Sequence, residues 1–137
     1  MISALRTYPL VFLSTPYTLY PQSIDIAAVE AAKLVAKLLR NGIKVYSPIA
    51  HSHWVAKYGD INPHDHSIWL PFNQELMNRC DAQLIGMLES WENSYGIAEE
   101  ITCFRAADKP IFYINPETLE VTAHESARDS ATGGGAG

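Results

Sequence analysis

The chain has 137 residues, of which 47% are hydrophobic and 18% are charged, and its net charge is −5. This composition predicts one globular domain, and the negative charge gives no electrostatic reason to expect a nucleic-acid polymer as a partner. No apolar run approaches the length of a membrane span and the N-terminus lacks a signal-peptide pattern, so we expect a cytoplasmic protein with no membrane partner.

The first part of the chain predicts a strand, a helix and a second strand. Residues 9–14 form a continuous apolar run, which suits a strand buried on both faces of a parallel sheet. Ser23 or Asp25 can cap a helix that runs to about Arg40. Ile43–Ile49 is predicted as the second strand. This order implies a right-handed βαβ crossover.

The rest of the chain continues the alternation. Residues 50–66 are rich in His, Asp, Asn and Pro and are predicted to form a long irregular loop, functional or mobile. Beyond it we predict a helix at Ser67–Cys80, a strand at Ala82–Leu88 and a second helix at Ser94–Ala107. A strand at Ile111–Ile114 and a short edge strand at Leu119–Thr122 follow.

This alternation predicts an α/β fold, a flavodoxin/Rossmann-like three-layer sandwich with a mostly parallel sheet of four to five strands. One domain is expected over residues 1–125, followed by a disordered Gly-rich tail, residues 126–137. Open sheets of this class bind ligands at the carboxyl ends of their strands. The loops after the first three strands are therefore the expected walls of the binding pocket.

Two adjacent acidic residues, Glu99 and Glu100, lie on the helix predicted after the third strand. One interpretation is that they merely offset the helix dipole, although in the second turn that effect is fading. The other is that one carboxylate is held in the pocket. Consecutive helix positions point about 100° apart, so only one of the two can face the pocket squarely.

Several segments together resemble the nucleoside 2-deoxyribosyltransferase superfamily, which includes the 2′-deoxynucleoside 5′-monophosphate N-glycosidases, and most resemble its uncharacterised branch of small bacterial and phage proteins. The resemblance spans roughly residues 9–115 and rests on Phe12–Tyr17, Cys80–Ala82, the Trp91-x-x-Ser94-x-Gly96-x-x-x-Glu100 pattern and Lys109–Ile111. The spacings from Ser94 and to Lys109 match the family through Glu100 rather than through Glu99.

The resemblance implies cleavage or transfer at the N-glycosidic bond of a 2′-deoxynucleoside or its 5′-monophosphate. Glu100 would be the nucleophile that traps the deoxyribosyl C1′, since a carboxylate stabilises and captures an oxocarbenium-like centre. Ser94 would bind a sugar hydroxyl or the 5′-phosphate, and Gly96 would allow close approach. The chemistry implies no metal and no organic cofactor, and the family implies a homodimer or a higher homo-oligomer.

The loop after the first strand is the second expected part of the site. By resemblance, Ser14, Thr15, Pro16 and Tyr17 would contact the base and the sugar. Some relatives carry a tyrosine where this chain has Phe12, and a glycine about where it has Thr15. The hydroxyl that would support the nucleophile in those relatives is thus missing at residue 12.

Further candidates for substrate contact are His51, just after the second strand, and Trp91, which either lines the pocket or packs in the core. The expected general acid is also replaced: family enzymes have an aspartate where this chain has Asn73. An asparagine can hold a substrate but cannot supply a proton. The acid would then be one of several open candidates: Asp60, Asp65, Glu75 or His51.

Two other classes of function stay open. In the first, the protein is a non-catalytic nucleotide-binding or sensing module, with Asn73 marking lost catalysis. In the second, it is a metal-dependent hydrolase that uses the 51–66 segment, where His51, His53, His64, His66 and Asp60 offer metal-ligand chemistry.

Overall fold

The computed structural model describes residues 2–124, so the predicted tail lies outside the described part of the chain. In chain order the elements are α1 (Ile2–Leu5), β1 (Val11–Ser14), α2 (Ile24–Arg40), β2 (Val45–Tyr46), α3 (Pro48–Gly59), α4 (His66–Arg79), β3 (Ala82–Gly86), the short 3-10 helix η1 (Trp91–Asn93), α5 (Tyr95–Ala106), β4 (Ile111–Ile114) and β5 (Val121–Ala123).

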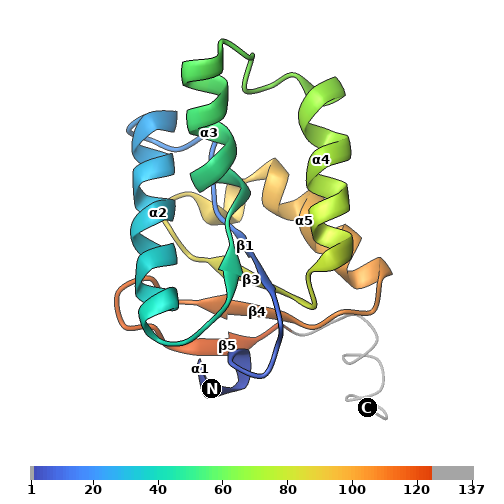
Figure 1. Cartoon of the computed structure of the whole chain (residues 1–137). Coiled ribbons are helices and arrows are strands. Elements are labelled where there is room, and N and C mark those ends of the chain that lie inside the picture. The colour runs from blue at the N-terminus through green and yellow to red at the C-terminus, as the bar shows by residue number, and fades with distance from the viewer. Residues whose placement is uncertain (1, 125–137) are drawn as a thin grey trace.

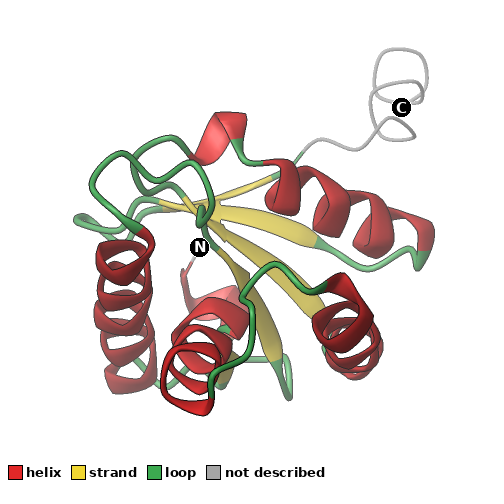
Figure 2. Ribbon diagram, turned by 90° about the horizontal axis from the view of Figure 1, so that it is seen from above, coloured by secondary structure: helices red, strands yellow, loops and turns green. Residues whose placement is uncertain are grey.

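The strands form one five-stranded sheet in the order β2-β1-β3-β4-β5. β2, β1, β3 and β4 are parallel, and β5 is antiparallel to β4. Helices flank both faces of the sheet (Figures 1 and 2). The predicted Rossmann-like three-layer α/β sandwich is therefore confirmed.

The core is divided between the two faces because side chains alternate along each strand. Val11 and Leu13 of β1 pack with α2, whereas Phe12, between them, packs with α4 and α5. Ser14, at the end of β1, is on the same side as Phe12 by this alternation. Gln83 of β3 also lies on that side and is fully buried. Two fully buried polar side chains thus lie on the α5 side of the sheet.

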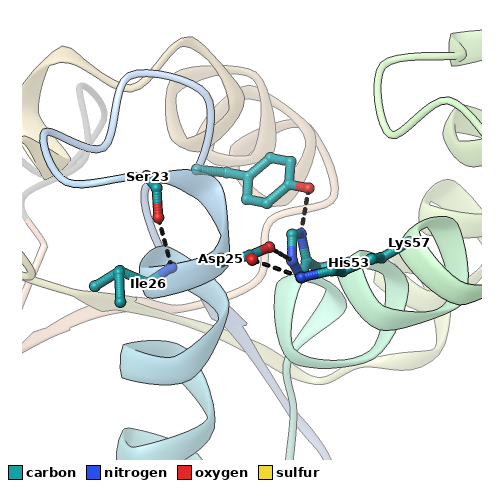
Figure 3. Close-up of polar contacts among 6 residues, drawn as sticks. Ser23, Asp25, Ile26, His53 and Lys57 are labelled. Atoms are coloured by element: carbon teal, nitrogen blue, oxygen red, sulfur yellow. Dashed lines mark hydrogen bonds and ion pairs between the residues drawn. The ribbon is translucent and has the colours of Figure 1, made fainter.

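Helix α2 follows its sequence signals closely. The hydroxyl oxygen of Ser23 accepts a hydrogen bond from the backbone N–H of Ile26 at 3.1 Å, which caps the first turn (Figure 3). Ala27, Leu34 and Leu38 recur at helical spacing and are buried against the sheet. The predicted cap and the C-terminal boundary of this helix are confirmed.

The prediction of an irregular loop over residues 50–66 is wrong for its first half, which forms α3. Ser47 caps this helix by accepting from the N–H of Ala50 at 3.0 Å, and Pro48 occupies its first turn, where its missing N–H costs nothing. Asp60, with φ of 58°, ends it in a left-handed conformation. Accordingly, the second strand is limited to the two residues of β2.

Gly86, at the end of β3, is required by close packing. A Cβ atom at this position would lie 2.8 Å from Leu34 Cδ2 and 3.0 Å from Thr15 Cγ2. We expect Gly86→Ala to lower the free energy of unfolding by about 1–3 kcal/mol through overpacking. Urea denaturation measures the change. Gly59→Ala is the control, because a Cβ there meets nothing within 4 Å, and equal losses in both variants would contradict the packing argument.

Candidate functional site

A cavity of about 690 Å³ opens at the carboxyl edge of the sheet. Its walls come from the loop after β1, from α3, which follows β2, from the α3–α4 loop and α4, and from α5, which follows β3. The cavity has the size of a small-molecule site. It lies where open parallel sheets place their ligands.

Glu100 lines this cavity from the second turn of α5. The helix is capped by Ser94, whose hydroxyl accepts from the N–H of Ile97 at 3.2 Å. Burial raises the pKa of the Glu100 carboxyl from 4.5 to about 7, while a hydrogen bond from the Ser14 side chain acts in the opposite direction. Glu99 also lines the cavity but is exposed.

Ser14 is oriented by Gln83. The side-chain amide of Gln83 donates to Ser14 Oγ at 2.8 Å, and both side chains are fully buried. Since that oxygen already accepts this bond, the single hydroxyl proton of Ser14 is available for the Glu100 carboxylate. Gln83 was not predicted as a functional residue. Its only signal in the sequence is one polar residue inside an apolar strand.

The structure brings six of the predicted site residues to the cavity, namely Glu100, Asn73, Thr15, Tyr17, Ser94 and Gly96. Ser14 reaches it through its contact with Glu100, and Pro16 is buried beside it without lining it.

The other two predicted contacts, His51 and Trp91, are not among the lining residues. His51 lies near Tyr46, with 3.4 Å between its Nδ1 and the tyrosine oxygen, and Trp91 packs on Tyr113 at a ring-centroid distance of 5.4 Å. Because α3 is a helix, His51 and His53 point in different directions, and it is His53 that lines the cavity.

Several polar atoms on the cavity wall lack hydrogen-bond partners within residues 2–124, and two of them belong to predicted site residues. Thr15 Oγ1 and Asn73 Oδ1 are inaccessible to solvent and make no hydrogen bond there. A buried polar atom without a partner is costly in free energy. Both atoms therefore favour a ligand that brings polar groups of its own.

A series of polar contacts links Tyr17 to α2 and α3. Figure 3 shows its members Asp25, His53 and Lys57. The Tyr17 oxygen is 2.7 Å from His53 Nδ1, and His53 Nε2 is 2.6 Å from Asp25 Oδ1. Lys57 Nζ donates to the other oxygen of Asp25 at 2.6 Å. Only 4% of His53 is exposed, so this imidazole is held in a fixed position.

Charge and burial both shift the pKa values of residues in this series of contacts. The hydrogen bonds from Lys57 and then His53 lower the pKa of Asp25, which keeps it a carboxylate. Burial, and then the negative charge of Asp25, raise the pKa of Tyr17 to about 12. Tyr17 therefore keeps its proton at neutral pH. The sequence offers His53 as a candidate metal ligand and Asp25 as a candidate helix cap, and it does not predict the contact between them.

The geometry does not favour the metal-site hypothesis. Both ring nitrogens of His53 are engaged, by Tyr17 and by Asp25. In the part of the chain from residue 2 to 124, no group of three or more His, Cys, Asp or Glu side chains is arranged to hold a metal ion. Over the same residues, no helix is both long and apolar enough to cross a membrane.

The fold and the site together define a Rossmann-like α/β protein with a carboxylate in a cavity at the carboxyl edge of its sheet. Residues 9–116 match the family described as Domain of unknown function (DUF1937), and the chain belongs to this family. The match covers β1 through β4 and so includes the whole cavity. No curated protein matches the sequence.

The raised pKa of Glu100 predicts a dependence of stability on pH. Between pH 4.5 and about 7 the unfolded chain has released the Glu100 proton while the folded chain retains it. Folding stability attributable to this group is therefore complete below pH 4.5 and falls as pH rises to about 7, by about 3 kcal/mol. Glu100→Gln should remove this contribution and be more stable than the wild type at pH 8.

Urea denaturation at pH 5 and pH 8 measures this effect. Glu99→Gln, one position away on the same helix, is the matched control and should keep the wild-type fall because Glu100 is intact. A Glu100→Gln variant with the wild-type pH dependence would contradict the assignment of the shift to Glu100.

Proposed function

We propose that the protein cleaves or transfers at the N-glycosidic bond of a 2′-deoxynucleoside or its 5′-monophosphate, with Glu100 as the nucleophile. The observation that carries the proposal is the position of Glu100 on the wall of the cavity, with Ser14 hydrogen-bonded to it. The sequence resemblance to nucleoside deoxyribosyltransferases selects the same residue independently.

The chemistry requires a carboxylate that faces the anomeric carbon. As the bond between C1′ and the base nitrogen breaks, C1′ gains positive charge, which a nearby carboxylate stabilises and then captures as a glycosyl ester. With a pKa of about 7, a substantial part of Glu100 is ionised at neutral pH. The hydrogen bond from Ser14 fixes the direction of that carboxylate. Water or a second base would then release the sugar.

Other residues of the cavity suit a nucleoside. Thr15 Oγ1 and Asn73 Oδ1 are polar atoms without partners in the described chain, and a sugar or a base supplies complementary groups. Trp69 lines the cavity and presents a ring on which a base can stack. Ser94 and Gly96 lie at the N-terminus of α5, which suits a hydroxyl or a phosphate. A homo-oligomeric state and a cytoplasmic location accompany the proposal as expectations.

A second candidate is a nucleotide-binding or sensing module without turnover. Asn73 favours it, because this residue lines the cavity where the resemblance expects an acid and it has no proton to give. The two candidates share a ligand class but differ in whether free base appears.

Incubation with the common 2′-deoxynucleosides and their 5′-monophosphates, followed by chromatography for free base, tests the proposal. We expect the wild type to release base from at least one substrate, and Glu100→Ala to lower this rate by more than about 1,000-fold, as expected for loss of a nucleophile.

Glu99→Ala is the matched control and should retain the activity. Base release that survives in Glu100→Ala would contradict the nucleophile assignment. Saturable nucleotide binding by a wild type that releases no base would favour the sensing module instead.

A further inference from the structure

The contact chain from Tyr17 through His53 to Asp25 has no role in the nucleophilic step. Two of its members, Tyr17 and His53, line the same cavity as Glu100. A leaving nucleobase departs more easily when it is protonated, and Asn73 cannot provide the proton. The cavity therefore needs a proton donor other than Asn73.

The partners of His53 determine which of its nitrogens exchanges a proton. Asp25 is a carboxylate and can only accept, so His53 Nε2 carries a hydrogen and donates to it across 2.6 Å. Nδ1, which is 2.7 Å from the Tyr17 oxygen, is then the nitrogen that gains or loses a proton. When Nδ1 is protonated it donates to Tyr17, and the Tyr17 O–H becomes free to donate to a ligand.

We infer that Tyr17 and His53 form the proton relay of the proposed reaction, in which Tyr17 is the catalytic acid that touches the leaving nucleobase and His53 is the positioning residue that resupplies its proton. This inference rests on the proposed function. The geometry that carries it is the continuous pair of short contacts, at 2.7 and 2.6 Å, from the cavity wall to a fixed carboxylate.

The relay step balances. The bond between C1′ and the base nitrogen breaks, its electron pair goes to the base, and Glu100 forms the ester bond to C1′. The Tyr17 O–H proton passes to the base nitrogen, and the proton on His53 Nδ1 passes to the Tyr17 oxygen. His53 is left neutral. When water later attacks C1′, its proton returns through Tyr17 to His53 Nδ1 and Glu100 is freed as a carboxylate.

The surroundings of His53 suit this cycle. Asp25 accepts the hydrogen bond from His53 Nε2 and so fixes the ring, and Lys57, from α3, holds the other carboxylate oxygen. Two further aromatic neighbours within residues 2–124 are His64, whose ring centroid is 6.1 Å from that of Tyr17, and Trp54, whose ring meets His53 edge-on at 4.6 Å. A histidine oriented by a carboxylate and in contact with a hydroxyl is the general arrangement for proton transfer at an active site.

The test compares two leaving groups. One substrate is a 2′-deoxynucleoside that the wild type cleaves, and the other is 4-nitrophenyl 2-deoxyriboside, whose nitrophenolate leaves without protonation. We expect Tyr17→Phe and His53→Gln to lower kcat on the deoxynucleoside by about 100- to 10,000-fold, the range for loss of a general acid. On the nitrophenyl substrate the loss in both variants should be much smaller than on the deoxynucleoside, whereas Glu100→Ala should cleave neither.

Tyr20→Phe is the matched control, since Tyr20 belongs to the same loop but is not among the lining residues, and it should cleave both substrates normally. Equal losses on both substrates in Tyr17→Phe and His53→Gln would show a structural role and overturn the relay. So would full activity of either variant on the deoxynucleoside.

Failure of the relay and failure of the proposed function are distinguishable. A wild type that cleaves the deoxynucleoside, with Tyr17→Phe and His53→Gln fully active on it, keeps the proposed function and overturns the relay. A wild type that cleaves neither substrate overturns both. Should Tyr17→Phe fail to fold, as judged by thermal unfolding, His53→Gln decides the question alone.

Discussion

The site depends on the parallel pairing of β1 with β3. This register sets Phe12 opposite Gln83 and Ser14 opposite Ile85, so that Ser14 and Gln83 face the same side of the sheet, toward α5. A slip of one residue in either strand would turn one of these polar side chains to the opposite face. The hydrogen bond between them would then be lost, and with it the orientation of the hydroxyl that contacts Glu100. Two neighbouring strands of the core therefore determine how a carboxylate on a separate helix is held.

The two sets of polar contacts at the cavity are held by different secondary-structure elements. Gln83 and Ser14 lie on β3 and β1, two central strands that pair with each other along their length. Asp25, His53 and Lys57 lie on α2 and α3, which pack against each other outside the sheet. The position of the Tyr17 hydroxyl relative to Glu100 therefore depends on how the α2–α3 pair packs beside the strands. A change in that packing would alter the contacts from Tyr17 through His53 to Asp25 and leave the Gln83–Ser14 contact intact.

The sequence predicted the elements that have strong local signals. β1 and β4 are short apolar runs, and α2 combines a serine cap with apolar residues at helical spacing. α3 was missed because its polar histidines hid a weakly amphipathic helix whose start is marked only by Ser47 and Pro48. Among the site residues, the family resemblance pointed to Glu100, Ser94 and Tyr17, whereas local patterns alone left Glu99 and Glu100 undecided. The roles of Gln83 and His53 could not be predicted, because their partners Ser14 and Asp25 are distant in the chain and only the tertiary fold brings them together.

Glu100 is held where ionisation opposes folding, so the group proposed to react also weakens the native state at neutral pH. At this position the ionised carboxylate that the proposed reaction requires lowers the stability of the fold. An evolutionary or laboratory screen that rewards only heat resistance would enrich amide substitutions there and lose the carboxylate. Retention of an acid at residue 100 in a heat-selected library would in turn show selection for a property other than stability.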